Sequence, residues 1–199
     1  MALTFILGGA RSGKSELAQR LAAASDRPVV FVATMQPGDD ELRSRVDAHR
    51  RERPSGWKTI EEPREVVGAL AAVEPGSYVI IDCITLWVSN LLVARLGEAA
   101  DASSASVDAA LDDVRGRVES LLTWCAAHEG DVAVVSNEVG LGVVPAYPLG
   151  RIFRDALGSA NAMLAAGADR TLHCTAGLVL DLKSLGARPV AESAPDARA

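Results

Sequence analysis

The chain has 199 residues, of which 49% are hydrophobic and only 4% aromatic, and its formal net charge is −6 at pH 7. This length and composition fit one α/β domain with a core of aliphatic side chains. The acidic balance argues against a protein that works chiefly on nucleic acid, and no apolar run has the length of a membrane span. Because the chain enters its first strand without a targeting segment, we expect a cytoplasmic protein.

Strand and helix patterns alternate along the chain. Apolar runs predict strands at 3–7, 28–34, 57–61, 78–82 and 131–136, and a hairpin of 171–174 with 178–182. Helical spacing predicts helices at 16–23, 41–51, 62–73 and 85–96, from 107 to before Gly130, and at 151–167. Continuous apolar strands between helices indicate a mainly parallel, doubly wound sheet with helices on both faces and the hairpin at one edge. We expect a surface loop at 97–106, a single domain over residues 1–183 and a frayed tail over 184–199.

A glycine-rich segment follows the first predicted strand and opens the first predicted helix. It fits the pattern G-x-x-x-x-G-K-S/T and consists of Gly8, Gly9, Ala10, Arg11, Ser12, Gly13, Lys14 and Ser15. In this strand–loop–helix context the pattern predicts a P-loop whose backbone N–H groups surround the phosphates of a nucleotide. Lys14 would reach the β- and γ-phosphates, and the Ser15 hydroxyl would bind Mg²⁺. The sequence therefore predicts a protein that binds a nucleoside triphosphate.

Polar residues stand where three of the predicted strands end. Asp82 ends an apolar strand, and it either takes part in a Mg²⁺ site or caps the helix that follows. Ligands of open α/β sheets bind at the carboxyl ends of strands, which also selects Thr34 and residues 136–138. Glu138 could be functional, as a general base or as an acid that supports the metal ligands, or it could be a solvated turn residue. The sequence leaves the functional and the structural interpretation open.

The segment 43–54 holds five arginines around His49. On a helix His49 would share a face with Leu42 and Val46, which by itself favours a half-buried structural histidine. The alternative is a nucleophile whose pKa the guanidinium groups hold down, while they also neutralise a triphosphate. His128 and His173 lack this setting and are assigned to structure. The cysteines are scattered, odd in number and without C-x-x-C spacing, so we expect buried thiols at Cys83, Cys125 and Cys174.

Several sequence blocks occur together in a fixed order. They are the glycine loop 8–15, Ala33-Thr34, and the segments 45–54, 57–61, 82–92, 136–145 and 153–161. Together they resemble the bifunctional adenosylcobinamide kinase / adenosylcobinamide-phosphate guanylyltransferase family of cobalamin biosynthesis. The resemblance extends from Leu3 to about Lys183.

This resemblance implies two reactions on one RecA-like scaffold. A nucleoside triphosphate, ATP or GTP, phosphorylates the aminopropanol hydroxyl of adenosylcobinamide. GTP then guanylylates His49, and the GMP passes to adenosylcobinamide phosphate to give adenosylcobinamide-GDP. The resemblance also implies Mg²⁺ or another divalent cation as cofactor, a corrinoid substrate and a homotrimer. The alternatives are a monofunctional P-loop kinase of a small metabolite with a structural His49, or a nucleotide-dependent switch.

The resemblance also assigns roles to residues. The resemblance makes His49 catalytic, whereas the chemistry of the glycine loop makes Lys14 catalytic and gives the metal to Ser15 and Asp82. Nucleotide contacts fall on the glycine loop and on Ala33, Thr34, Met35, Arg50, Arg51, Glu52, Arg53, Glu61 and Asp82. Either Glu61 or Asp82 would read the guanine edge. Arg11 contacts phosphate, crosses a subunit boundary or is solvated. Arg151, Arg154 and Asn161 are candidates for corrinoid binding, and trimer packing is the alternative role for them.

Overall fold

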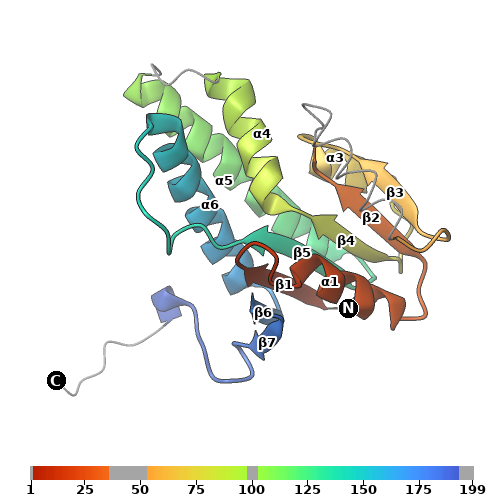
Figure 1. Ribbon diagram of the computed structural model, residues 1–199. Coiled ribbons are helices and arrows are strands. Elements are labelled where there is room, and N and C mark those ends of the chain that lie inside the picture. The colour runs from red at the N-terminus through yellow and green to blue at the C-terminus, as the bar shows by residue number, and fades with distance from the viewer. Residues whose placement is uncertain (1, 36–52, 98–102, 193–199) are drawn as a thin grey trace.

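The computed structural model of the protein describes residues 2–35, 53–97 and 103–192. The described residues form one seven-stranded sheet in the order β3-β2-β4-β5-β1-β6-β7 (Figure 1). Its strands are β1 (Leu3–Gly8), β2 (Val29–Ala33), β3 (Lys58–Glu61), β4 (Tyr78–Asp82), β5 (Val132–Asn137), β6 (Arg170–Thr175) and β7 (Leu178–Asp181). All neighbouring strands are parallel except the β6–β7 hairpin at the edge. The predicted α/β architecture is confirmed.

Helices cover both faces of this sheet. They are α1 (Lys14–Ala23), α3 (Val66–Leu70), α4 (Ile84–Leu96), α5 (Ser104–Ala127) and α6 (Pro148–Gly167), with a short 3-10 turn η1 (Val190–Glu192). One core packs α3, α4, α5 and α6 against the sheet, and the other packs α1 against the opposite face. Strands such as β2, which is buried at all five positions, lie between two apolar layers, and this explains their unbroken apolar sequences.

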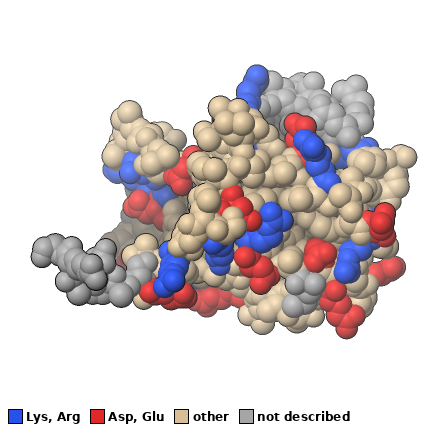
Figure 2. All heavy atoms as spheres, turned by 90° about the horizontal axis from the view of Figure 1, so that it is seen from below, with Lys and Arg blue, Asp and Glu red and all other residues tan. Residues whose placement is uncertain are grey.

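The layer of α4, α5 and α6 extends past the sheet in Figure 1, on the side where the parallel strands end. A helix that follows a parallel strand begins at the carboxyl edge of the sheet, and α4 follows β4 there. The face seen in Figure 2 carries acidic and basic side chains intermixed over most of its area. The carboxyl edge therefore has the glycine loop on one side and projecting helices on the other.

The largest differences between the observed helix boundaries and those that the sequence predicts fall on three helices. The predicted helix at 62–73 is reduced to Val66–Leu70, because the Glu62 carboxylate accepts the backbone N–H groups of Arg64 and Glu65 and forms a turn instead. Helix α5 begins inside the predicted loop, at Ser104, with Ser103 as its N-cap accepting the N–H of Ser106. Helix α6 begins with Pro148 in its first turn, three residues before the predicted start.

Four of the five side chains assigned to structure, the three cysteines and His128, are buried, whereas His173 on β6 is half-buried. Cys83, Cys125 and Cys174 are buried free thiols, and burial raises the pKa of Cys83 to about 11 and that of Cys125 to about 12. His128 is buried, stacks on Trp124 and shares a hydrogen bond of 2.8 Å with the carbonyl of Ser77. The helix expected at 41–51 lies outside the described residues. The division into a domain of residues 1–183 and a frayed tail stays a prediction.

Candidate active site

The glycine loop joins β1 to α1, as the sequence predicts. A Cβ atom on Gly8 would stand 2.1 Å from the carbonyl oxygen of Cys174, so only glycine fits where the loop leaves the sheet. Gly13 takes a positive φ of 94° as the N-cap of α1, and Arg11 takes one of 54°. These left-handed positions turn the backbone around a concave loop at a helix N-terminus, which is the geometry of an anion site.

Lys14 lies inside this loop with only 7% of its surface exposed. Its Nζ donates to the Gly9 carbonyl at 2.6 Å and to Ser12 Oγ at 3.4 Å. Burial lowers the pKa of Lys14 below its ordinary 10.5, and the negative charge of Asp82 opposes that shift. The ammonium is thus held by oxygens of its own loop, and phosphate oxygens entering the loop would be well placed to receive its hydrogen bonds.

Acidic side chains end two strands at the carboxyl edge, β4 and the outermost strand β3. Asp82 ends β4, and the sheet register pairs Asp82 with Ala33 and Ala33 with Glu61, which is exposed at the end of β3. The Ser15 hydroxyl and the Asp82 carboxylate are hard oxygen donors, which suit Mg²⁺ held mainly by substrate phosphates. Among the described residues, no three or more His, Cys, Asp or Glu side chains gather as a metal cluster. Within the described part of the chain, the donor set fits a Mg²⁺ held mainly by substrate phosphates.

Thr34 is fully buried, and its hydroxyl is engaged within the protein. It donates to the Cys83 carbonyl at 2.7 Å and accepts the Cys83 N–H at 2.9 Å, which joins the ends of β2 and β4. The Thr34 carbonyl accepts Asn90 Nδ2 from α4 at 2.9 Å. Thr34 therefore connects the end of β2 to the end of β4, next to Asp82, and to α4. Nucleotide contacts of Ala33, Thr34 and Met35 stay predictions.

The described end of the arginine-rich segment lies against β2. The guanidinium of Arg53 stands 3.7 Å from the ring centroid of Phe31, and Arg53 lines a surface hollow with Trp57 and Thr59. Phe31 pairs with Thr59, two residues before Glu61, so the hollow lies on the β3 side of the sheet. His49, Arg50, Arg51 and Glu52 lie outside the described residues, and their roles stay predictions.

The sequence does not predict the hydrogen bonds of a polar network at the end of β5. Ser136 Oγ donates to Asn161 Oδ1 at 2.6 Å, and Asn161 Nδ2 donates to the Asn137 carbonyl at 3.0 Å. The Asn137 N–H and Nδ2 both donate to Thr85 Oγ1 at 2.9 Å. The sequence selects residues 136–138 at a strand end and Asn161 as a candidate for corrinoid binding or trimer packing, but it does not pair them. In the structure Asn161 is the polar side chain on the otherwise apolar buried face of α6.

Glu138 lies directly beyond this network. Its backbone N–H donates to the Gly8 carbonyl at 3.1 Å, so the residue borders the glycine loop, and its carboxylate accepts the N–H of Gly140. The loop that follows exposes Leu141 and Val143 almost completely and is fastened to α6 by Arg151, which donates to the carbonyls of Pro145 and Ala146. Arg154 is half-buried on α6.

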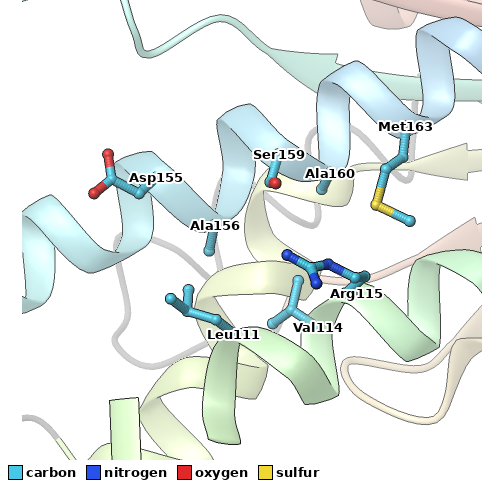
Figure 3. A pocket seen from close by; sticks show the side chains of 8 residues that line it. All are labelled: Leu111, Val114, Arg115, Asp155, Ala156, Ser159, Ala160 and Met163. Atoms are coloured by element: carbon cyan, nitrogen blue, oxygen red, sulfur yellow. The ribbon is translucent and has the colours of Figure 1, made fainter. Parts of the chain in front are cut away.

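A separate small pocket lies in the helix layer between α5 and α6 (Figure 3). Its floor is largely apolar, with Leu111, Val114 and Met163 beside the polar side chains of Arg115 and Asp155. None of the glycine-loop residues lines this pocket. Among the described residues, the predicted phosphate-binding features lie at the carboxyl edge and not at this pocket.

A strand-ending glycine loop, its buried lysine and a neighbouring strand-end acid define a nucleotide-binding P-loop protein of the α/β class. Solved structures agree on the fold. A protein of Pyrococcus horikoshii OT3 matches with a TM-score of 0.52 at 10% identity, over 95% of this chain and 93% of that one. A type III secretion system ATPase of pathogenic bacteria matches with a TM-score of 0.51 at 12% identity, over 87% of this chain and 51% of that one.

The chain belongs to the cobinamide kinase / cobinamide phosphate guanyltransferase family, whose model matches residues 4–182. The bifunctional adenosylcobalamin biosynthesis protein CobP of Pseudomonas aeruginosa is 40% identical, over 89% of this chain and 95% of that protein. The CobU proteins of Salmonella typhimurium and Escherichia coli are 37% and 35% identical, each over 91% of this chain and 99% of the relative. No helix among the described residues is both long enough and apolar enough to cross a membrane.

Proposed function

We propose that this protein phosphorylates the aminopropanol hydroxyl of adenosylcobinamide and then transfers GMP from GTP to the resulting phosphate. The observation that carries the proposal is the family match over residues 4–182, which contains a complete glycine loop with Lys14 buried inside it. Relatives that carry the name of a bifunctional adenosylcobalamin biosynthesis protein cover nearly the same length. The products are adenosylcobinamide phosphate in the first step and adenosylcobinamide-GDP in the second.

In the kinase step the acceptor hydroxyl attacks the γ-phosphorus of ATP or GTP. The bond from that phosphorus to the β–γ bridging oxygen breaks, and the nucleoside diphosphate leaves. Lys14 and the loop N–H groups stabilise the charge that develops on the phosphate oxygens. Glu138, whose backbone N–H donates to the Gly8 carbonyl, is the carboxylate that we assign to accept the hydroxyl proton.

A magnesium ion would be held by Ser15 and Asp82 and by the substrate phosphates, and it would neutralise phosphate charge. Ser15 lies in the first turn of α1, and Asp82 ends β4 close enough for its charge to affect the pKa of Lys14. The same two side chains would serve both steps, because each step uses a triphosphate.

In the transferase step we assign the nucleophile to His49. Its imidazole nitrogen attacks the α-phosphorus of GTP, and the bond to the α–β bridging oxygen breaks to release pyrophosphate. A phosphate oxygen of adenosylcobinamide phosphate then displaces the imidazole. Arg50, Arg51 and Arg53 would neutralise the triphosphate, and Arg53 has a fixed position over Phe31 from which to do so.

Label transfer tests the histidine step directly. GTP labelled at the α-phosphate should leave acid-labile, alkali-stable label on the wild-type protein and none on His49→Ala. As a matched control, His173→Ala changes a half-buried histidine of β6 and should keep the label. Label on His49→Ala would remove this residue from the mechanism, and a wild type that phosphorylates adenosylcobinamide without ever taking label would be a monofunctional kinase.

We also propose that the protein acts as a cytoplasmic homotrimer and that Glu61 or Asp82 reads the guanine edge. Guanine N1–H and N2–H₂ donate to a carboxylate, so Glu61→Gln or Asp82→Asn should reduce the preference for GTP over ATP in the transferase step. Light scattering on the eluting protein tests the trimer, and a mass of about 21 kDa would contradict it, because one chain has a mass of 20.8 kDa.

A further inference from the structure

Asn161 is a polar side chain on an apolar helix face. It is 6% exposed on α6, and Ala160 and Leu164 of the same buried face are at most 1% exposed. A buried amide is costly unless both its donor and its acceptor are paired. Both are paired here, and both partners belong to the last two residues of β5, Ser136 and Asn137. The Asn161 amide therefore holds the last two residues of β5, Ser136 and Asn137, by hydrogen bonds.

That stretch borders the glycine loop. Asn137 stands in register with Gly8, and the next residue, Glu138, donates its N–H to the Gly8 carbonyl at 3.1 Å. On the other side, Asn137 donates twice to Thr85, three residues after Asp82. The end of β5 thus lies between the glycine loop and the end of β4 that carries Asp82. Asn161 of α6 is hydrogen-bonded to this end of β5.

We propose that Asn161 is a positioning residue that holds Asn137 and Glu138 against the glycine loop during phosphoryl transfer. It acts through the Asn137 carbonyl and the Ser136 hydroxyl. The inference rests on the proposed function and extends it, because it places a structural requirement on a side chain of α6. Without the amide, the partly buried carbonyl of Asn137 loses a donor, and the backbone that carries Glu138 is free to rotate away from Gly8.

The variant Asn161→Asp gives a readout that a purely structural residue would not. The ionised carboxylate turns a second oxygen toward the Asn137 carbonyl and repels it. The protonated form regains a donor to that carbonyl and still accepts from Ser136 Oγ, so it restores both hydrogen bonds. Burial favours the neutral form of the introduced carboxyl, which brings this change into an accessible pH range.

The charged groups near position 161 lie on other parts of the helix layer. Strands β1 and β5 carry none, α6 carries Arg151, Arg154 and Asp155 in its N-terminal half, and α4 carries Arg95 in its last turn. Helix α5 carries Asp108, Asp112, Asp113, Arg115, Arg117 and Glu119. The hydrogen bonds of Asn161 itself go to the uncharged Ser136 and Asn137. Glu138, the residue after Asn137, is the ionisable group next to these partners, and it is present in Asn161→Ala as well. The difference in pH response between Asn161→Asp and Asn161→Ala, each measured relative to wild type, therefore isolates the introduced carboxyl.

The experiment measures steady-state phosphorylation of adenosylcobinamide by ATP between about pH 5.5 and 8.5. At pH 8 both Asn161→Asp and Asn161→Ala should lose about tenfold in kcat, the scale of one broken buried hydrogen bond, with KM for ATP changed less than threefold. As the pH falls, the ratio to wild type should recover for Asn161→Asp and stay flat for Asn161→Ala. His128→Ala, which removes a buried hydrogen bond to Ser77 far from the loop, should lower the unfolding midpoint and keep wild-type kcat.

A ratio that does not change with pH for Asn161→Asp, or wild-type kcat in Asn161→Ala, would overturn the positioning role. A second readout does not need turnover. The NMR amide signal of Glu138, which reports its bond to Gly8, should shift in Asn161→Asp at pH 8 and return toward the wild-type position at low pH. An unmoved Glu138 signal contradicts the inference, whereas a wild type without any kinase turnover contradicts the proposed function alone.

Discussion

The amino and carboxyl edges of the sheet, where the parallel strands begin and end, use polar groups in different ways. At the amino edge, Asp131 and Asp169 accept the backbone N–H groups of Ala2 and Leu3 at 2.8 and 2.7 Å, and His128 pairs with Ser77. These hydrogen bonds join the starts of β1 and β4 to residues at the ends of α5 and α6. At the carboxyl edge, the charge of Asp82 acts on the Lys14 ammonium, whose partner within its own loop, the Gly9 carbonyl, can be replaced by a substrate.

This difference teaches that burial of a polar group does not by itself mark a functional site. The amino-edge groups have partners that the fold supplies permanently, so their loss should affect stability. The carboxyl-edge groups gather at strand ends beside a helix N-terminus, where α/β proteins bind ligands, so their loss should affect chemistry. Substitutions at the two edges separate the two roles.

The largest effect is expected at Lys14. Lys14→Ala should lower kcat/KM for triphosphate-dependent turnover by about 10³-fold or more, because it removes the charge that stabilises the transferring phosphate. The unfolding midpoint should change little, since the buried ammonium also carries a desolvation cost. Rates with ATP and GTP, and thermal unfolding of the same preparation, check both statements. Turnover within tenfold of wild type would contradict the assignment of this loop as the phosphate site.

At Asp82 we expect a loss in metal affinity. Asp82→Asn should raise the Mg²⁺ concentration for half-maximal activity by about 10- to 100-fold, the range seen when residues that support metal ligands are substituted. Saturating Mg²⁺ should restore part of the rate. Titration of activity with MgCl₂ measures this, and Asp131→Asn at the amino edge is the matched carboxylate control, whose Mg²⁺ dependence should equal that of wild type.

A matched pair of glycines sharpens the comparison between the edges. A Cβ on Gly130 would stand 1.8 Å from the Ser77 carbonyl oxygen, and one on Gly8 would stand 2.1 Å from that of Cys174. Gly130→Ala and Gly8→Ala should each reduce the free energy of unfolding by about 1–3 kcal/mol, the scale of overpacking. Only Gly8→Ala should also reduce kcat at a temperature where both variants are folded. Chemical denaturation and kinetics on both proteins test this, and equal activity losses would contradict the division of roles.

The smallest effect concerns alkaline stability at the amino edge. Burial, aided by the charge of Asp131, raises the pKa of Tyr78 from 10.0 to about 12. Because the folded-state pKa is the higher one, the unfolded state loses its proton first. The contribution of Tyr78 to stability is therefore present below about pH 10 and lost as the pH rises toward 12.

At pH 11 the loss amounts to about 1 kcal/mol. Tyr78→Phe should lack this decline, so the difference in the free energy of unfolding between wild type and variant should shrink between pH 9 and 11. Urea unfolding at each pH measures it. A difference that stays constant over this range would show that Tyr78 does not have the raised pKa.

The sequence by itself determined the α/β class, the mainly parallel sheet and the glycine loop. Those features depend on local patterns: apolar runs flanked by turns, and Gly8 to Ser15 between a strand and a helix. The start of α6 was misplaced because Pro148 favours the first turn of a helix, and the helix at 62–73 was overstated because Glu62 forms a competing turn. Local signals compete at element ends, so boundaries are the least determined part of a sequence.

Only the tertiary structure decided which polar groups meet. Thr34 and Cys83, or Asn161 and Ser136, are distant in sequence and become partners because parallel strands bring their ends to one edge and α6 packs across it. The sequence could nominate Thr34 for the nucleotide, but only the packed sheet shows its hydroxyl joined to the end of β4. Residue type and spacing determine which chemistry is available, whereas long-range packing determines the pairing, because hydrogen bonds depend on distances that the order of residues does not contain.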